Sequence, residues 1–272
     1  MSVEIIELEK GEYLAPNYQT SVFGDLLVSV TQYQAEVPTG KWHAHQNPMF
    51  SFVLYGGNIE CRNSKTIERA AGSLNFYHAF EPHQNLYKSF PSKHISVEVE
   101  SDFMLRHGLE ECDLLIDEEA GGNSSFGFIK ILKEATINDL DTSSSIESLF
   151  LDLIGAKRFE NRFRSSPRWV NDLRDLLNDI WNTNVSLQQL SEVVGVHPIT
   201  ISKNFRKYFH YTLGEYMRRL KIMRALELMH FHEIPLTEVA LRCGFSDQSH
   251  FIRVFKNMTG FGPMEYRRLK NF

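Results

Sequence analysis

The C-terminal part of the sequence is dominated by the stretch LTEVALRCGFSDQSHFIRVF, residues Leu236–Phe255. Apolar residues recur every three or four positions on both sides of Gly244, which is typical of two amphipathic helices joined by a tight turn. Residues Leu187–Phe205 repeat this pattern around Gly195. The offset between the two copies is 49 residues up to the glycine and 50 residues after it. Two helices that cross at a glycine turn can place the second helix in the major groove of DNA. The chain is therefore predicted to carry two helix-turn-helix units, with a generic helical bundle as the alternative.

Local signals indicate where these helices begin and what separates them. Ser246 is predicted to cap the helix after Gly244, and Pro198 suits the first turn of the helix after Gly195. Between the two copies, one helical pattern runs from Leu213 to about Phe231. These 19 residues would rise roughly 28 Å, close to the ~34 Å of one turn of DNA. Such a helix would hold both units on one side of the duplex.

The distribution of charge supports contact with nucleic acid. Residues 1–165 carry 14 Lys and Arg against 24 Asp and Glu, a net charge of −10, whereas residues 166–272 carry 15 against 10, a net charge of +5. A surplus of cations in one part of an acidic chain is what contact with phosphates requires. Lys203 and Arg253 stand 50 residues apart, at the same position of each second helix, and Arg206 and Lys256 follow at the same offset. The alternative for such a charge run is an ordinary solvated helix surface.

Several motifs at fixed spacing lie within Ser186–Lys270. They are GVHP at Gly195–Pro198, CGFSDQSHF at Cys243–Phe251 and RVFK at Arg253–Lys256, followed by Gly260, Pro263, Tyr266 and Arg267. With these motifs, the segment resembles the DNA-binding domain of the AraC family of bacterial transcription regulators. The chain departs from the family at Gly262, where a capping Thr or Ser is usual, and at His210, which replaces a more usual glycine. The resemblance implies a transcription activator that binds double-stranded DNA, with RNA polymerase as a further partner.

The resemblance also implies which side chains meet the DNA. It places base-reading residues at Ile199, Ser202, Lys203, Gln248, Ser249 and Arg253. The residue types agree with this in part, because Lys and Arg suit guanine, Gln suits adenine and an aliphatic side chain suits the thymine methyl group. Phosphate contacts, which position a protein without selecting a sequence, are assigned to Thr200, Arg206, Lys207, His250 and Lys256. For His250, a packed residue at the turn is an equal alternative.

The first 156 residues follow a different pattern. Short apolar or alternating runs occur at Leu26–Val30, Phe50–Tyr55, Leu74–Tyr77 and Ile95–Val99, with Gly or Pro between them. Several short strands at such spacing predict an all-β sandwich or barrel. We therefore expect a two-domain protein, with an all-β domain and trailing helices at 1–156, a linker at 157–167 and an all-α DNA-binding domain at 168–272.

Composition narrows the cellular setting. The three cysteines show no paired spacing, which favours a reducing compartment. The N-terminus is acidic, and no apolar run approaches the ~18 residues of a membrane-spanning helix. The sequence therefore predicts a cytoplasmic protein that does not enter the membrane.

Histidines in the N-terminal part suggest the kind of sheet domain. His43 and His45 precede a predicted strand, and His83 follows Gly72 by eleven residues, a spacing that resembles the two motifs of cupins. A cupin domain is the usual sensor in the AraC family. In metal-binding cupins a glutamate follows the paired histidines, but this chain has Met49 there, which is no ligand for a hard divalent cation. We therefore expect no cofactor and no resident metal, and the three histidines are weak candidates for an all-imidazole site.

A pocket for a small-molecule effector is also predicted in this domain. Its candidate lining residues are Trp42, His43, His45, Phe52, Tyr77 and His83. An aromatic cavity with a few polar groups is typical of such sites, although an ordinary core is the alternative for most of these aromatic rings. The function predicted is a transcription regulator and not an enzyme. Two alternatives remain: a cupin-type metal-dependent enzyme with a DNA-binding appendage, and a dimeric DNA binder without an effector.

One predicted helix, Ser143–Ala156, carries a clean apolar stripe. Its members are Ile146, Leu149, Phe150, Leu153 and Ile154, at the spacing of one helix face. In the AraC family the equivalent helices pack two subunits together, so the resemblance implies a homodimer through Ile146, Leu149, Phe150 and Leu153. The alternative is that this stripe packs against the sheet domain of the same chain.

Overall fold

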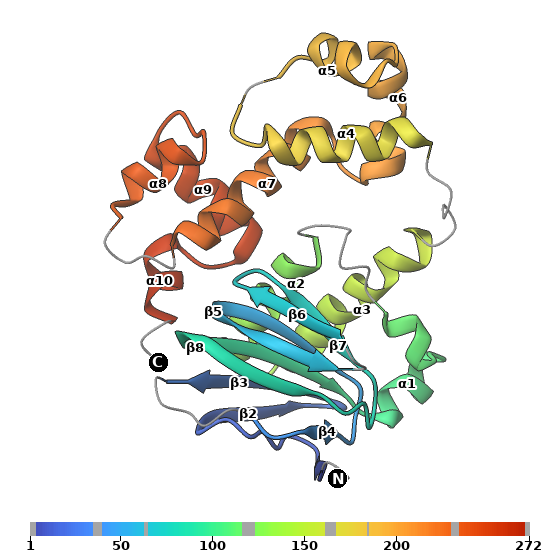
Figure 1. Ribbon diagram of the computed structural model, residues 1–272, viewed down its shortest axis with the longest axis vertical. Helices are drawn as coiled ribbons and strands as arrows, with labels where there is room; N and C mark the ends of the chain where they lie inside the picture. Colours follow the sequence, from blue (N-terminus) through green and yellow to red (C-terminus); the bar gives the residue numbers. More distant parts are fainter. Residues whose placement is uncertain are drawn as a thin grey trace. The chain divides into compact units, whose positions relative to one another are not determined.

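The computed structural model describes residues 4–34, 40–62, 65–115, 123–160, 167–183, 185–229 and 234–269. The chain divides into two compact units: Met1–Arg158 together with Glu265–Phe272, and Phe159–Met264. The first unit contains the β-strands and the second unit is helical (Figure 1). The prediction of a sheet-rich domain followed by a helical one is confirmed. The predicted boundaries stay a prediction, and most of the predicted linker, residues 161–166, lies outside the described residues.

A six-stranded antiparallel sheet forms the centre of the first unit. Its strands follow the order β2 (Asn17–Phe23), β3 (Leu26–Tyr33), β8 (Gln84–Val99), β5 (Met49–Arg62) and β6 (Lys65–Ala70), and β7 (Leu74–Tyr77) pairs with β5. Two short strands, β1 (Ile6–Leu8) and β4 (His43–His45), form a separate parallel pair. The four strands predicted from the sequence lie within β3, β5, β7 and β8. The likeness to a cupin stays a prediction.

One face of the main sheet is apolar. Because side chains alternate along a strand, Phe50 and Phe52 share a face with Val97, the partner of Phe50 on β8. All three are fully buried. The rings of Phe128 and Phe150 lie 5.4 and 5.6 Å from the ring of Phe50 and cover this face. They belong to α2 (Asn123–Ile137) and α3 (Thr142–Glu160), which follow α1 (Ser101–His107) and the 3-10 helix η1 (Glu111–Leu114).

The opposite face of the same sheet is buried and polar. The strand register gathers on it the buried side chains of Ser29, Thr31, Ser51, Asn75, His94, Ser96 and Glu98. Buried polar groups are stable only when they find hydrogen-bond partners, and such a concentration is unusual for a domain core. The polar face is therefore the part of the first unit in which a binding site is expected.

The apolar stripe of α3 packs within its own chain. Ile146 and Phe150 are fully buried, whereas Leu149 and Leu153 are half-buried. Leu153 lies directly over Gly127 of α2, where an added Cβ would come within 2.2 Å of the leucine side chain. The prediction that Ile146 and Phe150 face a second copy is therefore corrected. Phe150 packs against Phe50 of the apolar sheet face, and Ile146 is buried within the same chain, as the alternative required.

The second unit consists of two helix pairs and a connecting helix. α4 (Arg168–Asp179) precedes the first pair, α5 (Leu187–Val194) and α6 (Pro198–Phe209), and the second pair is α8 (Leu236–Arg242) and α9 (Gln248–Thr259). Between them, α7 (Leu213–Leu228) contacts α6, α8 and α9 (Figure 1). The helix α10 (Pro263–Arg268) follows α9 and belongs to the first unit from Glu265 on. α7 has 16 residues and is capped at Met229, so it is shorter than predicted; residues 230–233 lie outside the described part.

A continuous apolar core holds the first helix pair. It joins Val170, Leu173, Leu177, Leu190, Ile201, Phe205, Phe209, Tyr216 and Met217, from α4 through α7. The rings of Phe205 and Phe209 stack at 4.2 Å, and Tyr216 of α7 meets Phe209 edge-on at 5.1 Å. Since the buried faces of α6 and α7 share this core, the orientation of α6 is fixed by α7.

Candidate functional site

The turn of the first helix pair is defined by caps at both helices. Ser186 Oγ accepts a hydrogen bond from the Gln189 N–H at 3.3 Å, and the Gln189 side chain accepts one from the Ser186 N–H at 2.9 Å. This reciprocal pair begins α5, which ends at Gly195 with a left-handed φ of 68°. His197 then caps α6, whose first residue is Pro198. The predicted start of α6 and the predicted glycine turn are confirmed.

The turn of the second pair is packed more tightly. Gly244 has φ of 70°, and a Cβ there would lie 2.5 Å from the backbone oxygen of Asn182. Lys221 of α7 donates from Nζ to the Gly244 carbonyl oxygen at 2.8 Å and is itself only 8% exposed. The connecting helix therefore holds the second turn directly. No sequence pattern singled out Lys221, because an isolated lysine in an amphipathic helix is usually solvated.

The cap of α9 differs from the prediction by one residue. Asp247, and not Ser246, accepts a hydrogen bond from the His250 N–H, at 2.7 Å. Ser246 instead donates to the Asp247 carboxylate at 3.1 Å. The bonds from His250 and Ser246 lower the pKa of Asp247. A carboxylate at a helix N-terminus is favoured over a hydroxyl because it also interacts with the helix dipole.

The predicted base-reading residues lie on the outer surfaces of α6 and α9. Ile199, Ser202 and Lys203 are exposed on α6, and on α9 Ser249 and Arg253 are exposed while Gln248 is half-buried. Ile199 is 56% exposed, although apolar residues elsewhere on α6 are buried. An exposed aliphatic side chain among polar residues is what contact with a thymine methyl group requires.

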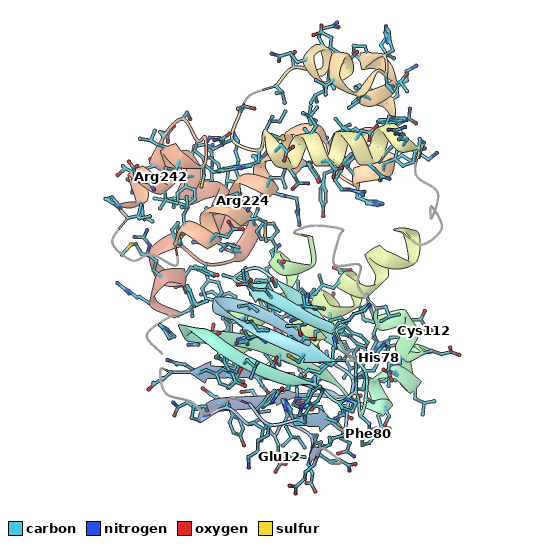
Figure 2. All side chains as sticks on the ribbon, viewed as in Figure 1. Glu12, His78, Phe80, Cys112, Arg224 and Arg242 are labelled. Carbon is cyan, nitrogen blue, oxygen red and sulfur yellow. The ribbon has the colours of Figure 1, made fainter. Side chains whose placement is uncertain are left out.

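The cations at equivalent positions are available for contact. Within the described part of the chain, Lys203 and Arg253 make no ion pair. Other cations of this unit are paired with carboxylates of their own helices: Arg224 with Glu227 at 3.0 Å and Arg242 with Glu238 at 2.7 Å (both arginines are labelled in Figure 2). Lys203 of α6 and Arg253 of α9 are therefore unneutralised cations at the same position of each helix.

The predicted phosphate contacts differ in their surroundings. Thr200, Arg206, Lys207 and Lys256 are exposed, as contact with the DNA backbone requires. His250 is half-buried, and its ring packs edge-on against Phe245 at 5.5 Å. For His250 the structure favours the alternative of a packed turn residue.

In the first unit, three predicted pocket histidines form a cluster. His43 and His45 lie on β4, and His83, just before β8, exchanges two backbone hydrogen bonds of 2.9 Å with His43. Each is at least 93% buried, with exposed fractions of 7%, 3% and 1%. Burial lowers the pKa of all three imidazoles, to about 3 for His45, and the neighbouring histidines add to the shift for His45 and His83. The three rings are therefore neutral near pH 7.

The other predicted pocket residues divide into two groups. Tyr77 lies beside the cluster, with its ring 4.2 Å from that of His83. Phe52 points to the apolar face with Phe50 and is part of the core, so its assignment to a pocket with the histidines is corrected. The reason is the strand period of two, which sends Phe52 and the polar residue Ser51 to opposite faces. Trp42 is half-buried and precedes β4.

Sequence reasoning missed two buried carboxylates of the polar face. Glu98 is the register partner of Met49; it accepts hydrogen bonds from the Tyr13 hydroxyl at 2.8 Å and from the Gly11 N–H at 3.1 Å. Glu60 accepts a hydrogen bond from the Tyr77 hydroxyl at 3.2 Å. An acidic residue at an inward position of an apolar strand, as in the run of Ile95 to Val99, was the available signal.

Comparison with known proteins identifies the helical unit. Residues 190–269 match the family model described as a helix-turn-helix domain. The transcriptional activator RhaS of Escherichia coli is 28% identical over 134 residues, which are 48% of this chain and 48% of that protein. An AraC-type regulator of known structure from Chromobacterium violaceum aligns with 38% of this chain and 91% of its own, at 22% identity and a TM-score of 0.36. This chain carries a helix-turn-helix domain.

The chain spans about half the length of the curated relatives that it matches. The alignment covers about half of RhaS. A crystal structure of ToxT from Vibrio cholerae, described as bound to an unsaturated fatty acid, aligns with 90% of this chain and 95% of its own, at 16% identity and a TM-score of 0.36. Among the described residues, none of the helices combines the length and the hydrophobicity needed to span a bilayer.

Proposed function

We propose that the protein is a sequence-specific DNA-binding regulator of transcription, and an activator, which reads two successive major grooves with α6 and α9. The observation that carries this proposal is the equivalence of Lys203 and Arg253, exposed at the same position of two helices that share the support of α7. RhaS, to which 48% of this chain is similar, is described as a transcriptional activator.

The length of α7 sets a condition on the DNA. Its 16 residues rise about 24 Å, less than the ~34 Å of one helical turn. Both units would reach successive grooves of one duplex only if the DNA bends toward the protein or the helices enter the grooves obliquely. Bending a site of this size costs on the order of 1–6 kcal/mol, and base steps that bend easily are therefore favoured within the operator.

The first unit is proposed to sense a small molecule. Its buried polar face and its histidine cluster favour a polar ligand over a purely apolar one. We propose RNA polymerase as a further partner and the cytoplasm, where the DNA lies, as the site of action. In this proposal the protein has no catalytic activity.

DNA reading is tested with the Arg253→Ala and Lys207→Ala variants. Arg253→Ala is expected to cost about 1–3 kcal/mol on the specific site and to relax the preference at one base pair, because a bidentate contact to guanine is lost. Lys207→Ala should weaken binding to all sequences alike and reduce the slope of affinity against salt concentration. Sites selected from random DNA and fluorescence anisotropy at several salt concentrations provide the measurement.

The matched control is Arg242→Ala, because this arginine is exposed but paired with Glu238. It should bind the selected site as the unchanged protein does. Equal losses of Arg253→Ala on specific and random DNA would show that this side chain does not read a base.

A further inference from the structure

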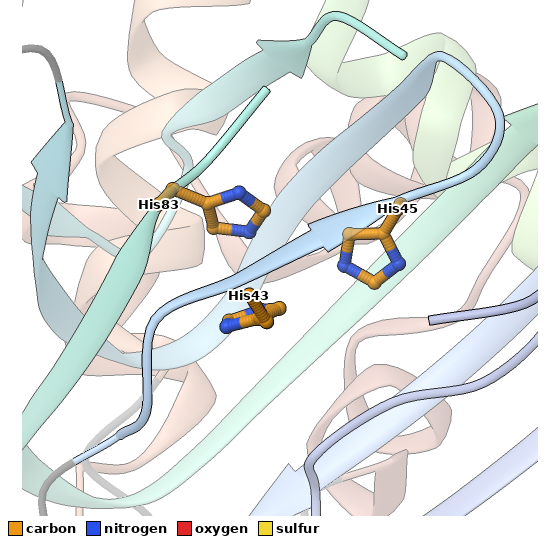
Figure 3. Close-up of side chains that lie close together, drawn as sticks. All are labelled: His43, His45 and His83. Atoms are coloured by element: carbon orange, nitrogen blue, oxygen red, sulfur yellow. The ribbon is translucent and has the colours of Figure 1, made fainter. Parts of the chain in front are cut away.

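The histidine cluster has the composition of a metal site. One nitrogen from each of His43, His45 and His83 lies within 4.8 Å of the others, and the three rings gather between β4 and the start of β8 (Figure 3). In a tetrahedral zinc site, nitrogens at about 2.0–2.1 Å from the ion are about 3.3 Å apart. Binding would therefore require the three nitrogens to approach one another by rotation of their side chains.

Backbone hydrogen bonds fix which nitrogen two of these rings offer. Nδ1 of His43 lies 2.9 Å from the Lys41 carbonyl oxygen, and Nδ1 of His83 lies 3.0 Å from the Glu81 carbonyl oxygen. Because a carbonyl can only accept, each Nδ1 carries the hydrogen and each Nε2 keeps its lone pair. Outer hydrogen bonds of this kind orient the histidine ligands of known metal sites.

His45 supplies the independent observation. Its ring is 3% exposed, and its Nδ1 has no hydrogen-bond partner within the described part of the chain. An unpartnered nitrogen in a buried ring is costly unless something else binds there. The ring stands 5.4 Å from that of His43 and 5.5 Å from that of His83.

The cations nearest the cluster are paired with carboxylates, and Arg62 is close enough that its charge contributes to the lowered pKa of His83. The guanidinium of Arg62 pairs with Glu60 at 2.6 Å and with Glu81 at 3.3 Å, and Arg69 pairs with Glu60 at 3.3 Å. These two cations are therefore balanced by two carboxylates. The ring of Tyr13 packs against that of His45, with 5.4 Å between the ring centroids, and its hydroxyl donates a hydrogen bond to Glu98.

We propose that His43, His45 and His83 bind one divalent transition-metal ion of the zinc class, with the fourth position open to water or another oxygen donor. Imidazole nitrogens suit zinc, and three protein ligands leave a position free in sites that bind a further molecule. Met49 supplies no carboxylate, and Glu98 opposite it is held by Tyr13 and Gly11. The ion therefore rests on three neutral ligands, in contrast to the expectation from the sequence that no metal is bound.

Zinc chloride is the probe that tests this proposal. The full chain, stripped with a chelator and dialysed, should bind one equivalent in a calorimetric titration, and zinc should raise its melting temperature. Replacing zinc with cobalt should give the visible absorption of a four-coordinate site. His83→Ala and His45→Gln are each expected to weaken zinc binding by more than about 100-fold, since loss of a ligand costs more than the 10–100-fold of an outer-shell change.

The control variant is His78→Ala. His78 is half-exposed and paired with Glu111 outside the cluster, so its removal should leave zinc affinity unchanged. Circular dichroism shows whether each variant folds, and the cobalt spectrum of the unchanged protein decides the matter if a variant does not. Absence of stoichiometric zinc, or unchanged zinc affinity in folded His83→Ala or His45→Gln, would overturn the site. None of these readouts involves DNA, so either result leaves the proposal of a DNA-binding regulator untouched.

Discussion

At the scale of single residues, burial determines the chemistry of His94 on the polar face of the sheet. This ring is 5% exposed and hydrogen-bonds through Nε2 with Ser92 Oγ at 2.9 Å. Burial lowers its pKa from the usual 6.5 to about 4. The folded chain therefore holds His94 neutral at a pH at which an unfolded chain would protonate it.

This shift predicts a loss of stability in acid. Below pH 6.5 the unfolded state binds a proton that the folded state does not, so the free energy of unfolding falls as the pH falls from 6.5 to about 4. The contribution of this one residue is on the order of 3 kcal/mol at the acid end. Urea unfolding at pH 7.5 and pH 5 should show a smaller difference for His94→Gln than for the unchanged protein. A difference as large in His94→Gln as in the unchanged protein would contradict the assignment.

The sequence predicts the exposed residues of α6 and α9 better than it predicts the partners of the buried polar residues. The equivalence of Lys203 and Arg253 follows from the repeat, which is a local property, and the position of Ile199 follows from the resemblance to the AraC family. Glu98 and Lys221 acquire their roles from partners 85 and 23 residues away along the chain. No local pattern specifies which distant hydroxyl or carbonyl group a buried charged residue will meet.

At the scale of elements, the two glycine turns differ in what surrounds them. Gly195 has open space where a Cβ would stand, whereas a Cβ at Gly244 would meet the Asn182 backbone. Both adopt a left-handed φ, so any side chain is strained at either position. The second turn carries an additional steric restriction.

Alanine substitutions should therefore have unequal costs. Gly195→Ala is expected to lower the free energy of unfolding by about 1–2 kcal/mol, from the backbone conformation alone. Gly244→Ala should cost about 1–3 kcal/mol more, because the Asn182 carbonyl must also move. Chemical unfolding of both variants provides the comparison. Equal losses would mean that the segment around Asn182 yields without cost.

The elements themselves could largely be predicted, but their packing partners could not. The apolar stripe of α3 shows that something covers it, and the sequence left open whether this is the same chain or a second copy. Phe150 packs against Phe50, a residue 100 positions earlier, and no spacing rule encodes that contact. His210 likewise takes a left-handed φ of 62°, at a position where the AraC family usually has glycine.

At the scale of the whole molecule, dimerisation remains a prediction. The surface of α3 that is available for an interface is smaller than the sequence indicated. Of the residues expected at the interface, only Leu149 and Leu153 are half-buried. These two residues could therefore still contact a second copy. Sedimentation of the full chain should show a dimer, and Leu149→Glu should convert it to a folded monomer, because a carboxylate in an apolar interface is unfavourable. Ser148→Glu adds the same charge at the adjacent exposed position and should leave the dimer intact. A monomeric unchanged protein would exclude pairing through α3.

Because Cys243 is buried, the rate of its chemical labelling reports how often the second unit opens. This thiol is fully buried behind the second turn, and burial raises its pKa to about 12, while Cys112 is exposed and Cys61 is partly exposed. A thiol-specific reagent reaches Cys243 only when the helices around it separate. The labelling rate of Cys243 therefore depends on how often α8 and α9 separate spontaneously. DNA that holds these helices together would lower this rate.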